Sequence, residues 1–278
     1  MLCDGGKSTL KPNYCASFLI AGLCLLPAMG IIAAPLSSIQ FSPDITIDPD
    51  DTLVADENVA EDNLSGGVSL TGVGAIPPNA DVTAYHVLEN GDRLLAFDIT
   101  VELAGSILIS PVDIVRYDGG AFSLEFDGSA LGVPAGTRID AVSMDAKGDL
   151  LISFDITIFL DDVLFADEDL VRFDGANFSM FFDGSMAGIA PSLDLDATHF
   201  DPGSNMLLMS FDGSGQVDGT QFSDEDLLEY GVVAGTWGMA FDGSANHSVW
   251  VAADLDAAYA ILGPDSIFKD GFEEPAPP

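Results

Sequence analysis

The chain has 278 residues, of which 48% are hydrophobic, and its formal net charge is −37, from 45 acidic and 8 basic residues. This apolar content is sufficient for a buried core and excludes wholesale disorder. The acidic excess excludes nucleic acid and anionic membranes as partners, because both require a basic surface, and it favours cations as counter-partners.

Residues 1–34 have the pattern of an export signal. Lys7 and Lys11 lie in a polar segment, and the apolar run ASFLIAGLCLLPAMGIIAA (16–34) follows with small residues near its end. Pro27 and the shortness of this run favour a cleaved signal peptide over a membrane anchor. We therefore expect signal-mediated export and a secreted or cell-surface protein, in the periplasm or outside the cell.

All three cysteines of the chain, Cys3, Cys15 and Cys24, lie in this segment. The mature protein would therefore contain no disulfide bond. An exported protein without disulfides must be held by core packing or by bound ions.

The remainder of the chain repeats with a period of about 57 residues. The segments AFDIT, SFDIT and SFDGS begin at positions 96, 153 and 210, and the tetrapeptide FDGS recurs with a similar spacing. An earlier copy is hidden at 44–59 (DITIDPDDTLVADENV), which aligns without a gap on 155–170 (DITIFLDDVLFADEDL). The chain therefore contains four units.

Each unit is predicted to contain four short strands. In the third unit these are 139–145, 150–158, 170–173 and 177–182, each with alternating apolar residues and flanked by turn residues. An acidic loop at 161–169 is predicted between the second and third strands. Asp-Gly pairs between short apolar runs indicate hairpins, because glycine tolerates the positive φ of tight turns.

Several units of four antiparallel strands predict an all-β fold, namely a four-bladed β-propeller over residues 35–262. The first unit begins with its second strand, at 37–47, and the missing first strand reappears at 254–262. These two segments are predicted to pair and close the ring. A β-solenoid and two stacked sandwiches remain as alternatives. The phenylalanines that recur with the repeat are predicted core residues: Phe97, Phe126, Phe154, Phe182, Phe211 and Phe241.

The order of strands in a unit resembles the hemopexin-type four-bladed propeller. The resemblance lies in an Asp-Ala pair at the start of the first strand, at 140–141, 196–197 and 256–257, with Thr-Ala at 83–84. The closing disulfide and the Trp-rich strand of that family are absent from the chain. In that family the central channel holds cations near this position. The resemblance implies a channel cation site, for which Ca²⁺ with its oxygen ligands is suited, at these residues: Thr83, Asp140, Asp196 and Asp256. The alternative is that these side chains bond the backbone at the start of the strand.

Residues 263–278 form a C-terminal tail. Its segment IFKDGFEEPAPP (267–278) is similar to the tails of uncharacterised exported bacterial proteins with FDGS repeats. This similarity implies secretion or surface sorting and no particular activity.

The acidic loops between the second and third strands are a second candidate cation site. Their candidate ligands are Asp161, Asp167, Asp218 and Asp224. No loop matches the spacing of a known calcium loop, and the second unit keeps only Asp113, which argues that these acids are not needed for folding. The alternative is a solvated acidic surface, as in a protein adapted to high salt.

His86 and His199 share one repeat position. On different blades they could form a metal site with a carboxylate, or they could be tolerated polar residues. Trp250 could face a ligand, but a role in packing is favoured. The sequence contains no HExxH, no G-x-S-x-G and no phosphate-binding loop.

These observations favour an exported, non-catalytic binding or surface-scaffold module, stabilised by Ca²⁺ and with a protein or glycan as its partner. One alternative is an extracellular hydrolase that uses channel or loop carboxylates. The other is a structural surface protein adapted to salt.

Overall fold

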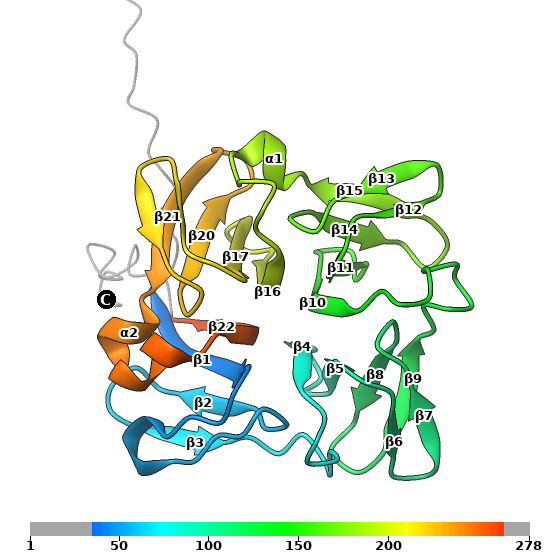
Figure 1. Ribbon diagram of the computed structural model, residues 1–278, viewed down its shortest axis with the longest axis horizontal. Coiled ribbons are helices and arrows are strands. Elements are labelled where there is room, and N and C mark those ends of the chain that lie inside the picture. The colour runs from blue at the N-terminus through cyan, green and yellow to red at the C-terminus, as the bar shows by residue number, and fades with distance from the viewer. Residues whose placement is uncertain (1–34, 264–278) are drawn as a thin grey trace, which may run out of the picture. The chain divides into compact units, whose positions relative to one another are not determined.

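The computed structural model describes residues 35–263, which form four four-stranded antiparallel sheets around a common centre (Figure 1). The four-bladed β-propeller that the repeat predicts is confirmed. The predicted signal peptide, and the tail beyond residue 263, lie outside the described residues. Among the described residues, no helix has the length and apolar character needed to cross a membrane.

The strands of each blade follow one another from the centre of the ring outwards. Blade 1 consists of β22 (Leu255–Leu262), β1 (Leu36–Pro43), β2 (Ala60–Asp62) and β3 (Val68–Leu70). Blade 2 consists of β4 (Val82–Val87), β5 (Arg93–Phe97), β8 (Ile114–Tyr117) and β9 (Phe122–Phe126). Blade 3 consists of β10 (Ile139–Met144), β11 (Leu150–Phe154), β14 (Leu170–Phe173) and β15 (Phe178–Phe182). Blade 4 consists of β16 (Leu195–Asp201), β17 (Met206–Phe211), β20 (Leu227–Gly231) and β21 (Thr236–Phe241).

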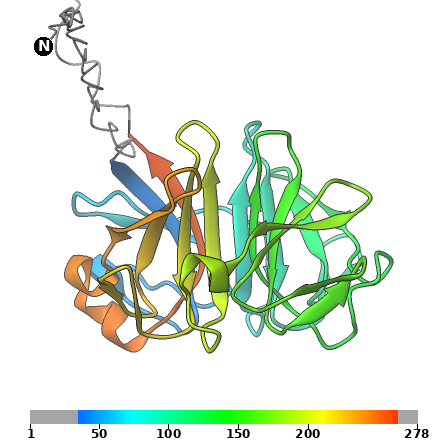
Figure 2. The ribbon, with the colours of Figure 1, turned by 90° about the horizontal axis from the view of Figure 1, so that it is seen from above.

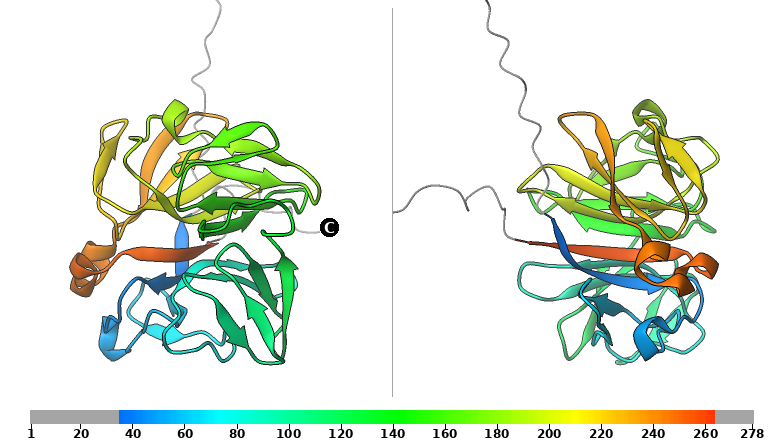
Figure 3. Two further views of the ribbon diagram at one scale, coloured as in Figure 1. Left: turned by 45° about the vertical axis from the view of Figure 1, so that its right-hand side comes forward. Right: turned by 90° about the vertical axis from the view of Figure 1, so that its left-hand side faces the viewer.

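The ring is closed by the last strand, as the sequence predicts. β22 pairs with β1 in antiparallel register, from Leu36 opposite Leu262 to Pro43 opposite Leu255. Figure 3 shows these two strands side by side in its right-hand view. The first and last strands of the propeller therefore share one blade.

The hydrophobic core lies between neighbouring blades. Four clusters of buried side chains each join two adjacent blades, and the six recurring phenylalanines are at most 5% exposed. Trp250 is fully buried and its ring contacts Phe41 edge to face, with centroids 5.0 Å apart. Packing is therefore the role that the structure gives to Trp250.

The acidic loops that the sequence predicts are largely small hairpins. They are formed by β6 (Val101–Leu103) with β7 (Ile107–Ile109), β12 (Ile158–Leu160) with β13 (Val163–Phe165), and β18 (Gly215–Val217) with β19 (Thr220–Phe222). In blade 1 a single bridge between Ile47 and Val54 encloses η1 (Pro49–Asp51). Asp161, Asp162 and Asp218 have positive φ at the hairpin tips. Aspartate tolerates this conformation better than most residues, so these acids serve the turn.

The recurring FDGS tetrapeptide is structural. In blade 3, Asp183 accepts a hydrogen bond from the N–H of Met186 and so caps α1 (Gly184–Ala187). A Cβ on Gly184 would lie 2.4 Å from the carbonyl oxygen of Glu168, so only glycine fits. Blade 4 repeats this arrangement at α2 (Gly243–Asn246), which η2 (Ser248–Ala252) follows.

One buried aspartate in each of blades 2 to 4 holds the FDGS turn against the third strand. Asp169 accepts hydrogen bonds from the N–H groups of Ala166 (2.8 Å) and Gly184 (2.9 Å). Asp113 and Asp226 make the same pair of bonds in blades 2 and 4. Asp113, the acid that the second unit keeps, is therefore the structural one.

Candidate functional sites at the two ends of the ring centre

The four inner strands β4, β10, β16 and β22 begin at one end of the ring centre and finish at the other (Figures 1 and 2). At their beginnings, an aspartate that follows the second strand bonds the backbone. Asp98 accepts from the N–H of Asp81 (2.8 Å), and Asp212 accepts from that of Asp194 (2.8 Å). Asp155 and Asp44 do the same in blades 3 and 1. In each blade, therefore, one of these four aspartates accepts a hydrogen bond from a backbone N–H group at the start of the inner strand.

A second set of aspartates gathers where the inner strands begin, and we call it the acidic end: Asp81, Asp140, Asp194, Asp196, Asp254 and Asp256. One carboxylate oxygen each from Asp140, Asp194 and Asp196 lie within 4.8 Å of one another, a spacing that suits a metal ion. Asp140 is 2% exposed and Asp196 is 9% exposed. Blades 3 and 4 together supply this three-carboxylate cluster.

The cluster contains carboxylate oxygens that the described part of the chain leaves without a hydrogen bond. Arg138 donates from Nε to Oδ1 of Asp140 at 2.7 Å. The other oxygen of that carboxylate, Oδ2, is buried without a partner among the described residues, as is Oδ1 of Asp194. Buried polar atoms are normally bonded, so these two oxygens indicate a missing proton or ligand.

Burial raises the pKa of every carboxyl group at the acidic end, and neighbouring carboxylates raise most of them further. The pKa is about 9 for Asp194, about 8 for Asp256, about 7 for Asp81, Asp140 and Asp254, and well above the ordinary value for Asp196. Arg138 opposes this effect at Asp140. Two carboxylates about 4.8 Å apart repel by roughly 3.5 kcal/mol at an effective dielectric constant near 20. The acidic end must therefore hold protons or a cation.

The four predicted channel residues do not all take part in this cluster. Asp140 and Asp196 belong to it, and Asp256 lies at the same end, where its charge raises the pKa of Asp196. Thr83 instead donates from Oγ1 to the carbonyl oxygen of Ile139 (2.7 Å), which links blades 2 and 3.

The predicted loop ligands separate into two groups. Asp167 and Asp224 lie at the rim of the acidic end, where their charges raise the pKa of Asp194 and Asp254. Asp161 and Asp218 are exposed at hairpin tips, and Asp161 accepts a hydrogen bond from the N–H of Phe178 (2.7 Å).

Sequence reasoning missed three aspartates of the acidic end, namely Asp81, Asp194 and Asp254. For two of them the signal was present as Asp-x-Asp at 194–196 and 254–256, which brings two carboxyl groups together where an inner strand begins.

At the opposite end the four inner strands bring one repeat position together, and we call this the histidine end: His86, Ser143, His199 and Tyr259. Each blade supplies one of these residues. The ring centroids of His86 and His199 are 6.1 Å apart, and Tyr259 lies edge-on to both, at 5.4 and 4.6 Å. The sequence indicates that these four residues share one repeat position that could line the ring centre, but not the distances between their rings.

The two imidazoles line a cavity of about 800 Å³ that opens at this end. Charged residues on its wall are Glu89, Asp145, Lys147 and Asp201. Burial lowers the pKa of His86 to about 3 and that of His199 to about 4. Both rings are therefore neutral at physiological pH.

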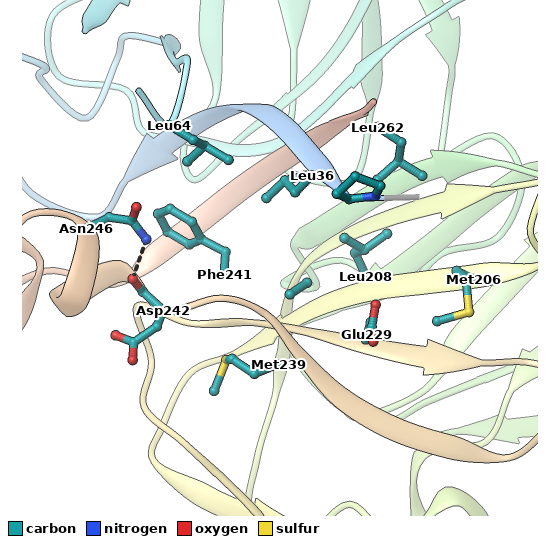
Figure 4. A pocket seen from close by; sticks show the side chains of 12 residues that line it. Leu36, Leu64, Met206, Leu208, Glu229, Met239, Phe241, Asp242, Asn246 and Leu262 are labelled. Carbon is teal, nitrogen blue, oxygen red and sulfur yellow. Dashed lines mark hydrogen bonds between the residues drawn. The ribbon is translucent and has the colours of Figure 1, made fainter. Parts of the chain in front are cut away.

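A further cavity of about 370 Å³ lies between blades 4 and 1 (Figure 4). Its wall includes the apolar side chains of Leu36, Leu208 and Met239, and Glu229 and Asp242 also border it. Unlike the two ends of the ring centre, its lining contains no buried polar atom without a partner among the described residues.

No family model and no curated protein matches the chain. Among solved structures it is similar to YCF48 bound to a D1 peptide, with 8% identity, a TM-score of 0.35, and coverage of 77% of this chain and 60% of that one. Virginiamycin B lyase from Staphylococcus aureus matches with 10% identity, a TM-score of 0.33, and coverage of 74% and 73%. The extracellular domain of a hybrid two-component system from B. thetaiotaomicron matches with 9% identity, a TM-score of 0.34, and coverage of 78% and 29%. The chain thus spans less than two thirds of the length of the first and third of these. At such low identity and TM-score, the likenesses carry no conclusion about what this chain binds.

Proposed function

We propose that the chain is an exported, non-catalytic binding module whose propeller is stabilised by Ca²⁺ at the acidic end. The observation that carries the proposal is the cluster of Asp140, Asp194 and Asp196, whose oxygens lie within 4.8 Å of one another and include buried atoms without partners. Export is supported by the signal-like residues 1–34. The partner of such a module would be a protein or a glycan.

The donor set fits a hard cation. Every candidate ligand is a carboxylate oxygen, and Ca²⁺ takes six to eight oxygen ligands with flexible geometry, whereas Mg²⁺ demands a stricter octahedron. A divalent ion would neutralise charges that otherwise require protons. Because Arg138 already pairs with Asp140, the oxygens available to an ion are Oδ2 of Asp140 and those of Asp194 and Asp196.

A thermal melt of the purified protein at pH 8 tests the proposal, in EDTA and in Ca²⁺, Mg²⁺ or Na⁺ at matched ionic strength. Extracellular modules bind Ca²⁺ with a Kd of about 10⁻⁴ M. At about 10 mM Ca²⁺ the folded state would gain roughly 2.7 kcal/mol, which raises Tm by roughly 5 to 10 °C. We expect a much smaller gain with Mg²⁺ and none with Na⁺.

Two variants that remove one charge each separate this site from the acidic surface. Asp196→Asn should abolish the response to Ca²⁺, because Asp196 belongs to the cluster. Asp161→Asn should retain it, because Asp161 lies at a hairpin tip whose positive φ asparagine tolerates. Equal responses to all three salts, or an equal loss in both variants, would instead indicate a surface adapted to salt.

A further inference from the structure

The histidine end contains buried polar atoms that the fold does not explain. His86 is 6% exposed and His199 is 7% exposed, and in each ring Nδ1 is buried without a hydrogen-bond partner in residues 35–263. A buried polar atom left unpaired costs about 1–3 kcal/mol. Two such atoms lie on neighbouring rings that come from opposite blades, which is consistent with a ligand that both imidazoles share.

The separation of the two rings suits one metal ion. A metal–nitrogen bond of about 2.0–2.1 Å places the ion roughly 3.2 Å from the centroid of an imidazole. Two imidazoles on one ion then have centroids roughly 5.2 Å apart at a tetrahedral angle and roughly 6.4 Å apart when they are opposite. The observed 6.1 Å between His86 and His199 is near the upper end of this range, and the two ring planes are inclined by 27°.

The surroundings supply an entry path and a supporting shell. Both imidazoles line the cavity of about 800 Å³, so an ion can reach them from solvent. The ring of Tyr259 contacts both imidazoles edge-on, which limits their rotation. Asp201 lies on the wall of the same cavity and favours positive charge near His199.

We propose that His86 and His199 bind a late first-row transition-metal ion at the floor of this cavity, with Cu²⁺ bound most tightly. Imidazole nitrogen suits Cu²⁺, Ni²⁺ and Zn²⁺, and Cu²⁺ leads the affinity order of these ions. With two protein ligands, the remaining coordination positions face the cavity and are available to water or to a donor group of a bound molecule. The site uses other donors than the acidic end and does not depend on Ca²⁺ binding there.

The test is a titration of the purified mature protein with Cu²⁺ after treatment with EDTA, followed by calorimetry and by electron paramagnetic resonance. We expect one Cu²⁺ per chain with hyperfine coupling from two imidazole nitrogens, and weaker binding of Zn²⁺ at the same site. His86→Ala and His199→Ala should each lower the affinity by more than about 100-fold, because loss of a ligand exceeds the 10–100-fold effect of an outer-shell change.

Two control variants locate the signal. His247→Ala removes the third imidazole of the chain, whose Nε2 is bonded to Asp62 at 2.8 Å, and should leave Cu²⁺ binding unchanged. Asp196→Asn should leave Cu²⁺ binding unchanged as well, although we expect this variant to lose the response to Ca²⁺. Circular dichroism checks that the histidine variants fold. The nitrogen hyperfine coupling is measured on the unaltered protein, so this part of the test does not depend on the folding of any variant. No Cu²⁺ binding, coupling from fewer than two imidazoles, or an affinity insensitive to both His86 and His199 would overturn the proposal.

Discussion

The two ends of the ring centre are built from the same four strands, yet they use the repeat in opposite ways. At the acidic end three of four units place an aspartate at one position, Asp140, Asp196 and Asp256, so repetition accumulates like charges in a buried place. At the histidine end the equivalent position is not conserved between the units, because it holds histidine in two blades, serine in one and tyrosine in one. The first arrangement affects stability through charge, and the second leaves two buried imidazole nitrogens without a partner among the described residues.

Both ends also differ from the acids that the repeat uses for structure. Asp98 and Asp212 bond the backbone where an inner strand begins, and Asp169 bonds two N–H groups near the FDGS turn. Their carboxylates have protein donors, whereas Oδ2 of Asp140 has none in the described part of the chain. An aspartate that recurs with the repeat therefore indicates a binding site only where its carboxylate oxygen accepts no hydrogen bond from the protein.

The largest expected effect is on the pH dependence of stability without metal. Five carboxyl groups of the acidic end have pKa values of about 7 to 9 in the folded state, against ordinary values near 4, and the pKa of Asp196 is also well above its ordinary value. The folded state therefore holds more protons than the unfolded state, so stability is lost as pH rises from about 4 through the folded values. One pKa unit corresponds to roughly 1.4 kcal/mol, and a net difference of about 3 to 4 units would lower Tm by roughly 10 °C or more.

Melts in EDTA between pH 5 and pH 8.5 measure this loss. Asp194→Asn should make the dependence shallower, because it removes a carboxyl group whose pKa in the folded state is about 9. Asp161→Asn should leave the slope unchanged, and Ca²⁺ should restore Tm at pH 8.5. A Tm that is constant or rises over this range would contradict the account of the acidic end.

A structural acid should behave differently. Asp169→Ala removes the acceptor for the N–H groups of Ala166 and Gly184 and should destabilise the fold by about 2–4 kcal/mol. The loss should be the same in EDTA and in Ca²⁺, measured by urea denaturation. Asp174→Asn, at an exposed turn, is the matched control and should cost less than about 0.5 kcal/mol. If Ca²⁺ rescued Asp169→Ala, the division between structural and site acids would fail.

The contrast shows what the sequence could and could not supply. The fold was predictable because strand alternation, Asp-Gly turns and the displaced first strand at 254–262 all specify one ring. Asp140 and Asp196 were predictable from their repeat position, but their partner Asp194 depends on how blades 3 and 4 meet. Likewise, a shared repeat position relates His86 to His199, but only the narrow ring centre brings their rings to 6.1 Å. Contacts between blades join residues that are far apart in the chain, so no pattern in a short stretch of sequence predicts them.

Removing the positive charge at the acidic end should strengthen cation binding. Arg138→Gln leaves the charge of Asp140 without its partner at 2.7 Å, so the cluster becomes more negative. We expect Ca²⁺ to bind several-fold to about tenfold more tightly at pH 8 in calorimetry, because the side chain of Arg138 is partly exposed and its effect is screened. Arg116→Gln, which removes a surface arginine paired with Asp92, is the control. An unchanged affinity in Arg138→Gln would place the Ca²⁺ site elsewhere.

The smallest effect on stability is expected at the histidine end. His199→Phe replaces a buried ring that has an unpaired Nδ1 by an apolar ring, and such a replacement is nearly neutral or slightly stabilising. Tm in EDTA should stay within roughly 2–4 °C of the unaltered protein, and the response to Ca²⁺ should be retained in full. A loss of more than about 2 kcal/mol would contradict this expectation and would show that the fold itself depends on the His199 side chain. If His199→Phe keeps its stability but loses Cu²⁺ binding, the two ends act independently. The carboxylates of the acidic end then determine how stability depends on pH and Ca²⁺, whereas the histidine end binds a ligand without affecting stability.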